Sequence, residues 1–293
     1  MKITPLHPFG AGVDGIDLSL QLDPSQSAAI EAAMDQHAML VFLGQVLGQQ
    51  QQVALAKSFG PLDLGFSKVR QRPSRLEFRE LGDMSNVGLD GAVADRANEK
   101  ILSMLANQLW HSDSSFQQPR AKYSILYAVT VPPKGGDTEF ADLRLAYDAL
   151  PEWRRQQIMG LIAVHDALHS RFLLGADNFT EEQRKAIPPA RWPLVQTDLR
   201  TGRKSLFVGI HAREVVGMTV PEGRVLLHDL LEHATQTDFV HRHRWQPGDV
   251  VMWDNTATLH RGRHYDLAQR RELRRATTQE ISLSPEAAGL ILN

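Results

Sequence analysis

Short strands joined by tight turns fill the second half of the chain, and this pattern narrows the fold class. Residues 240–255, "VHRHRWQPGDVVMWDN", are typical of a strand, a Pro-Gly-Asp turn and a second strand. Residues 123–132, "YSILYAVTVP", and 274–283, "RRATTQEISL", also have strand-like composition. Strands and helices do not alternate regularly, so a doubly wound sheet is excluded. The pattern predicts a mainly β domain, a β-sandwich or jelly roll, with flanking helices.

The first half predicts strands over 16–22 and 39–44, each followed by a helix. Asp23 and Pro24 are typical of an N-cap and a first helical residue, and Gly60 ends the helix over 49–60. Later helices are expected over 143–161 and 222–236. No linker divides the sequence, which predicts a single domain over 1–293. A lid or loop insertion is expected over 172–193.

Composition limits the kinds of partner and site. The 32 basic and 34 acidic residues give a formal net charge of -2, which favours neither a nucleic acid nor a membrane partner. Cysteine is absent, so disulfides, thiolate nucleophiles and cysteine-ligated metals are excluded. A cytoplasmic location is the expectation. Any metal site has to be built from histidines and carboxylates.

One candidate metal site starts at "LWHSDSSFQQP", residues 109–119. His111 and Asp113 are two residues apart, so in a strand they share a face, whereas Ser112 points away from both. With twelve histidines in the chain this signal is weak by itself, because a match of this length has a high false-positive rate. One more histidine would complete the two-histidine, one-carboxylate set of non-haem Fe(II) oxygenases. His260 follows an apolar strand and is the candidate, with His264, His241 and His243 as rivals; His241 and His243 read more simply as an exposed strand face.

Four arginines between residues 270 and 275 follow this histidine-rich region. Such a run is usually a solvated basic face. This one enters a strand-like segment, so alternate arginines must face inward, where a guanidinium binds carboxylates bidentately. The arrangement suits an anionic cosubstrate close to a metal.

Four longer motifs, which occur in a fixed order along the chain, contain the candidate residues described above. "NQLWHSDSSFQQP", "VPPKGGDTEFADLRLAYDALP", "HRWQPGDVVMWDNTATLHRGRHYD" and "RRELRRATT" together resemble the taurine and 2,4-dichlorophenoxyacetate dioxygenase family of Fe(II)/2-oxoglutarate enzymes. The resemblance runs from about Leu6 to Thr278 and is nearest to the 2,4-dichlorophenoxyacetate branch. It implies a double-stranded β-helix, a form of the jelly roll.

The resemblance also implies roles for single residues. His111, Asp113 and His260 are expected to ligate and activate the iron. Thr138 and Arg271 match the positions that bind 2-oxoglutarate. The expected substrate contacts are Arg275, for the anionic group, and Lys68, Asn107 and His211, each of which reads equally well as a surface or structural polar residue.

The implied reaction uses 2-oxoglutarate and O2, with ascorbate helpful in vitro. We expect a small anionic aromatic substrate: hydroxylation of the methylene of an aryloxyacetate such as 2,4-dichlorophenoxyacetate would give a phenol, glyoxylate, succinate and CO2. The alternatives are taurine-like alkylsulfonate hydroxylation, a zinc hydrolase and a non-catalytic metal-binding jelly roll. Arg271 and Thr138 disfavour the last two, which do not need a buried anion site. A homo-oligomer is expected from the resemblance alone.

Overall fold

A computed structural model describes residues 1–64, 73–175 and 180–281. Its largest sheet has seven strands in the order β1-β2-β3-β13-β5-β15-β4. Neighbouring strands are antiparallel except for the parallel pair β2 and β3. Their bounds are β1 Lys2–Pro5, β2 Ala11–Asp14, β3 Met39–Phe42, β4 Leu81–Ser85, β5 Ala121–Thr130, β13 Val250–Asp254 and β15 Glu272–Gln279.

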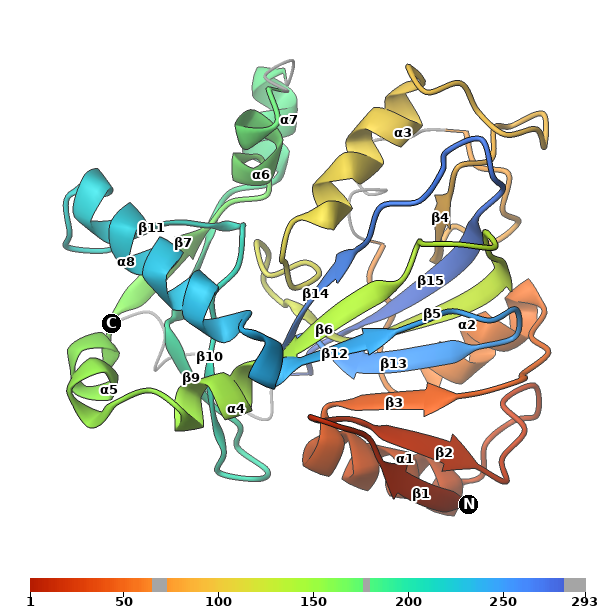
Figure 1. Cartoon of the computed structure of the whole chain (residues 1–293), viewed down its shortest axis with the longest axis horizontal. Helices are drawn as coiled ribbons and strands as arrows, with labels where there is room; N and C mark the ends of the chain where they lie inside the picture. Colours follow the sequence, from red (N-terminus) through yellow and green to blue (C-terminus); the bar gives the residue numbers. More distant parts are fainter. Residues whose placement is uncertain (65–72, 176–179, 282–293) are drawn as a thin grey trace.

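A second, three-stranded sheet faces the first. It has the order β12-β6-β14, with β12 Val240–His243, β6 Thr138–Asp142 and β14 Thr258–Gly262. In the core between the sheets, Phe140 of β6 packs against Trp253 of β13 with a ring-centroid distance of 5.3 Å. Leu273 and Val41 belong to the same buried cluster. The two facing sheets form the expected double-stranded β-helix with flanking helices, so this prediction is confirmed (Figure 1).

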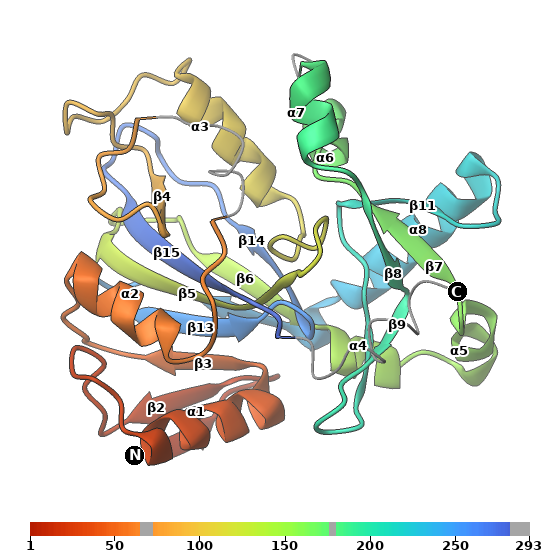
Figure 2. The ribbon, with the colours of Figure 1, turned by 180° about the vertical axis from the view of Figure 1, so that it is seen from behind.

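Two helices cover the other face of the large sheet. α1 (Pro24–His37) and α2 (Gln49–Lys57) bury apolar residues against β3, β5 and β13. The predicted N-cap is confirmed, because the Asp23 side chain accepts a hydrogen bond from the Gln26 backbone N–H at 2.9 Å. Figure 2 shows both helices on this face.

The remaining elements pack beside the small sheet or at one end of the molecule. β11-β7-β8 form a three-stranded sheet and β9 pairs with β10. In both views α3 and the α6–α7 pair project from the same end (Figures 1 and 2). The bounds are α3 Glu99–Met104, the 3-10 helix η2 Leu105–Gln108, α4 Leu143–Asp148, α5 Glu152–Ile158, β7 Ile162–His165, α6 His169–Leu173, α7 Glu181–Ala186, β8 Ala190–Pro193, β9 Val195–Thr197, β10 Lys204–Leu206, β11 Ala212–Val215, α8 Val220–Ala234 and the 3-10 helix η3 Thr237–Phe239.

Three local expectations differ from the structure. Residues 16–22 form turns, and the strand lies earlier, at Ala11–Asp14. The helix expected over 143–161 is two helices, because Pro151 is extended and serves as the N-cap of α5. The segment 172–193 holds α7 and β8 and is therefore not a plain loop, although residues 176–179 lie outside the described part. Its closure as a lid stays a prediction.

None of the helices in the described ranges is both long and apolar enough to cross a membrane.

Candidate metal and cosubstrate site

The expected ligand segments meet through one short antiparallel contact. The His111 backbone N–H donates to the His260 carbonyl at 3.1 Å, and the His260 N–H donates back at 2.9 Å. The strand expected around residue 111 is reduced to this bridge, and Asp113 begins a turn. The potential ligand atoms of His111, Asp113 and His260 nevertheless lie within 4.8 Å of one another.

The imidazole rings present matching nitrogen atoms to the carboxylate. His111 Nδ1 lies 2.7 Å from the Leu109 carbonyl, which only accepts, so Nδ1 carries the proton and Nε2 keeps its lone pair. His111 Nε2 lies 3.9 Å from Asp113 Oδ1, and His260 Nε2 lies 3.8 Å from Asp113 Oδ2. Two imidazole nitrogens and a carboxylate are a donor set that suits a divalent first-row metal.

The rival histidines lie elsewhere. His264 is exposed and is not part of this group. His243 is buried, with Nε2 3.0 Å from Asp249 Oδ2, so its expected place on an exposed strand face was wrong. His241 is partly buried and contacts the edge of Phe9.

Burial sets the protonation state of the two histidines, and Arg275 sets that of Asp113. Burial lowers the pKa of His111 and lowers that of His260 further below the ordinary value. Burial disfavours the charged form of Asp113 too, but the neighbouring Arg275 guanidinium, together with the Ser124 hydroxyl, outweighs it and holds the pKa of this carboxyl well below its usual range. At neutral pH the set therefore consists of two neutral imidazoles and a carboxylate, the forms that bind metals.

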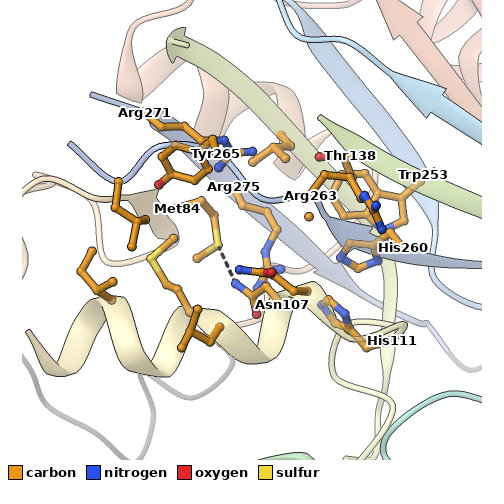
Figure 3. Close-up of a pocket in the computed structure, with 17 residues that line it drawn as sticks. Met84, Asn107, His111, Thr138, Trp253, His260, Arg263, Tyr265, Arg271 and Arg275 are labelled. Carbon is orange, nitrogen blue, oxygen red and sulfur yellow. Dashed lines mark hydrogen bonds between the residues drawn. The ribbon is translucent and has the colours of Figure 1, made fainter. Parts of the chain in front are cut away.

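A pocket opens beside this cluster and contains about 770 Å³ of empty space, open solvent included. Figure 3 shows His111 and His260 on one side and Arg271 with Tyr265 on the other. The apolar residues that line the pocket include Met84, Ile101, Met104, Leu105, Leu126, Trp253 and Leu267. The polar ones include Asn107, Thr138, Arg263, Arg271 and Arg275. The pocket is therefore largely apolar with a few convergent polar groups, as small-molecule sites commonly are.

Arg271 and Thr138, the expected 2-oxoglutarate contacts, both line this pocket. Arg271 is buried and donates from Nε and Nη2 to the Gly136 carbonyl, at 3.3 and 3.0 Å. Among the described residues no carboxylate forms an ion pair with it. Burial lowers its pKa and outweighs the longer-range effects of Tyr265 and Asp137, which raise it. Thr138 Oγ1 accepts from the Trp245 indole N–H at 2.9 Å, so its own hydroxyl proton remains available to an acceptor.

Arg275 and Asn107, two expected substrate contacts, also line the pocket. Arg275 pairs through Nη1 with Asp113 Oδ1. Within the described residues, its Nε and Nη2 make no hydrogen bond. Asn107 belongs to η2, and its amide lies 4.0 Å from the sulfur of Met84. Arg271 and Arg275 thus face the same pocket, as even spacing predicted, although Arg271 lies just before β15 and the strand register shifts between Glu272 and Leu273.

The other two expected contacts lie differently. His211 is buried edge-on to His111 and Phe116, with ring-centroid distances of 6.2 and 5.0 Å. It does not line the described pocket. Lys68 falls outside the described residues, so its role stays a prediction.

The helix α3 also contributes to this pocket, which was not predicted from the sequence. Ile101 and Met104 of α3 and Leu105, the first residue of η2, follow an i, i+3, i+4 pattern and line the pocket, whereas Leu102 is 52% exposed and does not. This helical periodicity was the available signal. The short helix gives one wall of the pocket an apolar surface.

Comparison with known proteins gives a consistent picture. Residues 2–277 match the family described as taurine catabolism dioxygenase TauD, TfdA family. The alpha-ketoglutarate-dependent 2,4-dichlorophenoxyacetate dioxygenase of Cupriavidus pinatubonensis is 60% identical over 94% of this chain and 96% of that protein. The (S)-phenoxypropionate/alpha-ketoglutarate dioxygenase of Sphingobium herbicidovorans is 35% identical over 92% and 91%. The crystal structure of AAD-2 with Mn(II) and N-oxalylglycine has a TM-score of 0.89 and 43% identity, covering 96% of this chain and 98% of that chain.

Proposed function

The chain belongs to the TauD/TfdA dioxygenase family, and from this membership we propose that it is an Fe(II)- and 2-oxoglutarate-dependent oxygenase of aryloxyacetates. The proposed reaction converts 2,4-dichlorophenoxyacetate, 2-oxoglutarate and O2 into a phenol, glyoxylate, succinate and CO2. Membership in this family makes the chain a 2-oxoglutarate-dependent dioxygenase, whereas the substrate and the metal are the proposed part. The names of the relatives support the choice of an aryloxyacetate over an alkylsulfonate.

The observation that carries the cosubstrate assignment is the neutral partner of Arg271. A buried guanidinium normally pairs with a carboxylate, because an uncompensated charge in the interior is unfavourable. Here the partner within the described residues is a carbonyl, and the side chain lines the pocket beside Thr138. A dicarboxylate that reaches the metal with one end would supply the missing anion with the other. 2-Oxoglutarate has this shape and charge.

His111, Asp113 and His260 would hold the iron, since their donor atoms fit a divalent first-row ion. When bound there, Fe(II) supplies the oxidative decarboxylation of 2-oxoglutarate and the insertion of one oxygen atom into a substrate C–H bond. The protein fixes the positions of the reactants. Arg271 and the Thr138 hydroxyl hold the far carboxylate of 2-oxoglutarate, and the apolar side chains of the lining leave few polar partners for water.

The substrate carboxylate is proposed to bind Arg275, and its aromatic ring to pack against the apolar wall of the pocket. Arg275 lies at the pocket lining next to Asp113, and its Nε and Nη2 can donate to the substrate carboxylate. The wall formed by Ile101, Met104 and Met84 offers a surface for the aromatic ring. The methylene between the ether oxygen and the carboxylate would then lie close to the metal.

The bond cleavage that follows hydroxylation needs no protein acid or base. The product carries a hydroxyl and an aryl ether on the same carbon, which is a hemiacetal. Its collapse breaks the C–O bond to the ring, moves the hydroxyl proton to the phenol oxygen and leaves glyoxylate.

The test is turnover by the purified protein with Fe(II), ascorbate, 2-oxoglutarate and O2. We expect succinate and a phenol in equal amounts from 2,4-dichlorophenoxyacetate, and little sulfite from taurine. Preferred sulfite release would contradict the aryloxyacetate assignment and leave the oxygenase intact. Absence of succinate with both substrates, together with no visible absorption band for the anaerobic Fe(II)–2-oxoglutarate complex, would favour a zinc hydrolase or a non-catalytic metal protein.

A further inference from the structure

We propose that Ser124 and Asn255 are positioning residues that fix the Asp113 carboxylate for metal binding. The proposal rests on the proposed function, because it takes Asp113 as a metal ligand. It assigns a role to two residues outside the ligand set, both of them fully or almost fully buried: Ser124 is 0% and Asn255 1% exposed. They come from β5 and from the turn between β13 and β14.

Asn255 holds the backbone of the ligand. Its Oδ1 accepts from the Asp113 backbone N–H at 3.0 Å and from the Trp253 indole N–H at 3.0 Å. Both partners can only donate, so the orientation of the amide group is determined. Its Nδ2 must then donate, and it does so to Ser124 Oγ at 3.0 Å and to the Lys122 carbonyl at 3.4 Å.

Ser124 holds the side chain of the ligand. A serine hydroxyl has one proton and two lone pairs. The Ser124 hydroxyl donates its proton to Asp113 Oδ2 at 2.7 Å. The lone pairs then accept from Asn255 Nδ2 and from the Thr277 hydroxyl, whose oxygen lies 3.3 Å away. Every polar atom of Ser124 and Asn255 is thereby satisfied.

This network also connects the two segments that carry the ligands. Asn255 lies five residues before His260 in the turn that leads into β14, and it holds the backbone of Asp113. The His111–His260 bridge joins the same segments on the other side. A carboxylate held in this way loses little conformational freedom when the metal binds, so the network should increase metal affinity.

The experiment compares Ser124→Ala with Ser112→Ala. Both variants remove one buried hydroxyl close to the ligands, but Ser112 Oγ donates to the Thr258 carbonyl at 3.0 Å rather than to Asp113. Mn(II) binding is measured by calorimetry without 2-oxoglutarate, and the melting midpoint is measured on the metal-free proteins. Asn255→Ala is the second variant of the network.

We expect Ser124→Ala and Asn255→Ala to weaken Mn(II) binding by about 10- to 100-fold, the usual effect of losing a hydrogen-bond partner of a ligand. Ser112→Ala should stay within about threefold of wild type, although its melting midpoint falls as much as that of Ser124→Ala. Wild-type affinity in Ser124→Ala, or an equal loss in Ser112→Ala, would overturn the positioning role while wild-type turnover still supports the proposed function. Failure of the wild type to bind Mn(II) would overturn the metal site and this proposal together.

Discussion

Arg271 keeps a positive charge inside the protein against the Gly136 carbonyl oxygen and the ring of Tyr265, whose centroid lies 5.5 Å from the guanidinium carbon. Replacing it with glutamine removes the charge and keeps an amide N–H at the position of Arg271 Nε, which donates to the Gly136 carbonyl at 3.3 Å. We expect Arg271→Gln to raise the 2-oxoglutarate requirement about 10- to 100-fold, because a charge-assisted contact is worth about 1.5–3 kcal/mol. Succinate formation at varied 2-oxoglutarate concentration measures this effect.

Arg271→Gln should weaken 2-oxoglutarate binding but stabilise the protein in the absence of 2-oxoglutarate. Without cosubstrate, Arg271→Gln is expected to unfold at a slightly higher temperature than wild type, since a buried charge without an anionic partner has been removed. Added 2-oxoglutarate should stabilise the wild type and leave the variant nearly unchanged. Arg270→Gln is the matched control, because that neighbour is partly exposed and pairs with Glu272. An unchanged 2-oxoglutarate requirement in Arg271→Gln contradicts the assignment.

The third metal ligand can be tested with two histidines four residues apart. His260→Ala should abolish turnover and remove the anaerobic Fe(II)–2-oxoglutarate absorption band, because one of three donor groups is lost. His264→Ala should keep most activity, since His264 is exposed and lies outside the group. The reverse result would show that the assignment between these two histidines was wrong.

Sequence patterns could predict the expected metal and cosubstrate residues, but not the residues that hold Asp113 in position. The spacing of His111 and Asp113 is local, and long ordered motifs indicated His260, Thr138 and Arg271. Ser124 and Asn255 left no such signal. Their contacts with Asp113 depend on how β5 and the β13–β14 turn lie against residues 111–113, which no local spacing encodes.

At the scale of the elements, α3 decides the shape of the apolar wall. Lys100 fastens it to β4 and to the chain that follows, donating to Asp83 at 2.8 Å, to Ser85 at 3.0 Å and to the Val87 carbonyl at 2.8 Å. This attachment holds Ile101 and Met104 at the pocket. Substitutions of Ile101 or Met104 should therefore change which substituted aromatic rings the pocket binds.

Met104→Phe tests this wall with a larger and stiffer side chain. We expect the KM for 2,4-dichlorophenoxyacetate to rise about tenfold relative to unsubstituted phenoxyacetate, since overpacking commonly has an unfavourable effect of about 1–3 kcal/mol. The 2-oxoglutarate requirement should change little. Leu102→Phe is the control, because Leu102 belongs to the same helix and is 52% exposed. If the KM for both aryloxyacetates rose equally, the substituted ring of the substrate would not contact Met104.

Elements with strong local signals were predicted well. The Asp23 cap, the β3 strand and the two strands β12 and β13, which lie in different sheets, follow from turn residues and apolar runs. The strand expected over 16–22 was wrong, because alternation also occurs in a turn segment: Leu18 is buried, whereas Leu20 is 66% exposed. The break at Pro151 was overlooked because helical periodicity continues across it.

For the whole molecule, buried His165 links stability to pH. Its ring stacks on Phe207 at 5.0 Å, and neither nitrogen has a hydrogen-bond partner within the described residues. Burial, followed by the charge of Arg120, lowers the pKa of His165 from 6.5 to about 3. Between these values the unfolded chain binds a proton that the folded protein does not, so stability falls as pH falls from 6.5 towards 3.

His165→Phe removes this titration and keeps a ring to stack on Phe207. Between pH 7 and pH 5 we expect the variant to lose less unfolding free energy than wild type, by up to about 2 kcal/mol. Urea unfolding at the two pH values measures the difference. His228→Phe serves as the control, since the His228 side chain is 70% exposed. Parallel pH dependence of wild type and His165→Phe would exclude His165 as the origin.

The neutral partner of Arg271 has a consequence for how the enzyme slows as its reaction proceeds. Decarboxylation shortens 2-oxoglutarate at the end next to the metal and leaves the distal carboxylate of succinate as it was. Arg271 and Thr138 should therefore retain the product with the same contacts. We expect succinate to compete with 2-oxoglutarate in initial-rate measurements, and Arg271→Gln to weaken this inhibition together with the affinity for the cosubstrate. A cell that removes succinate quickly would then keep the enzyme working at its full rate.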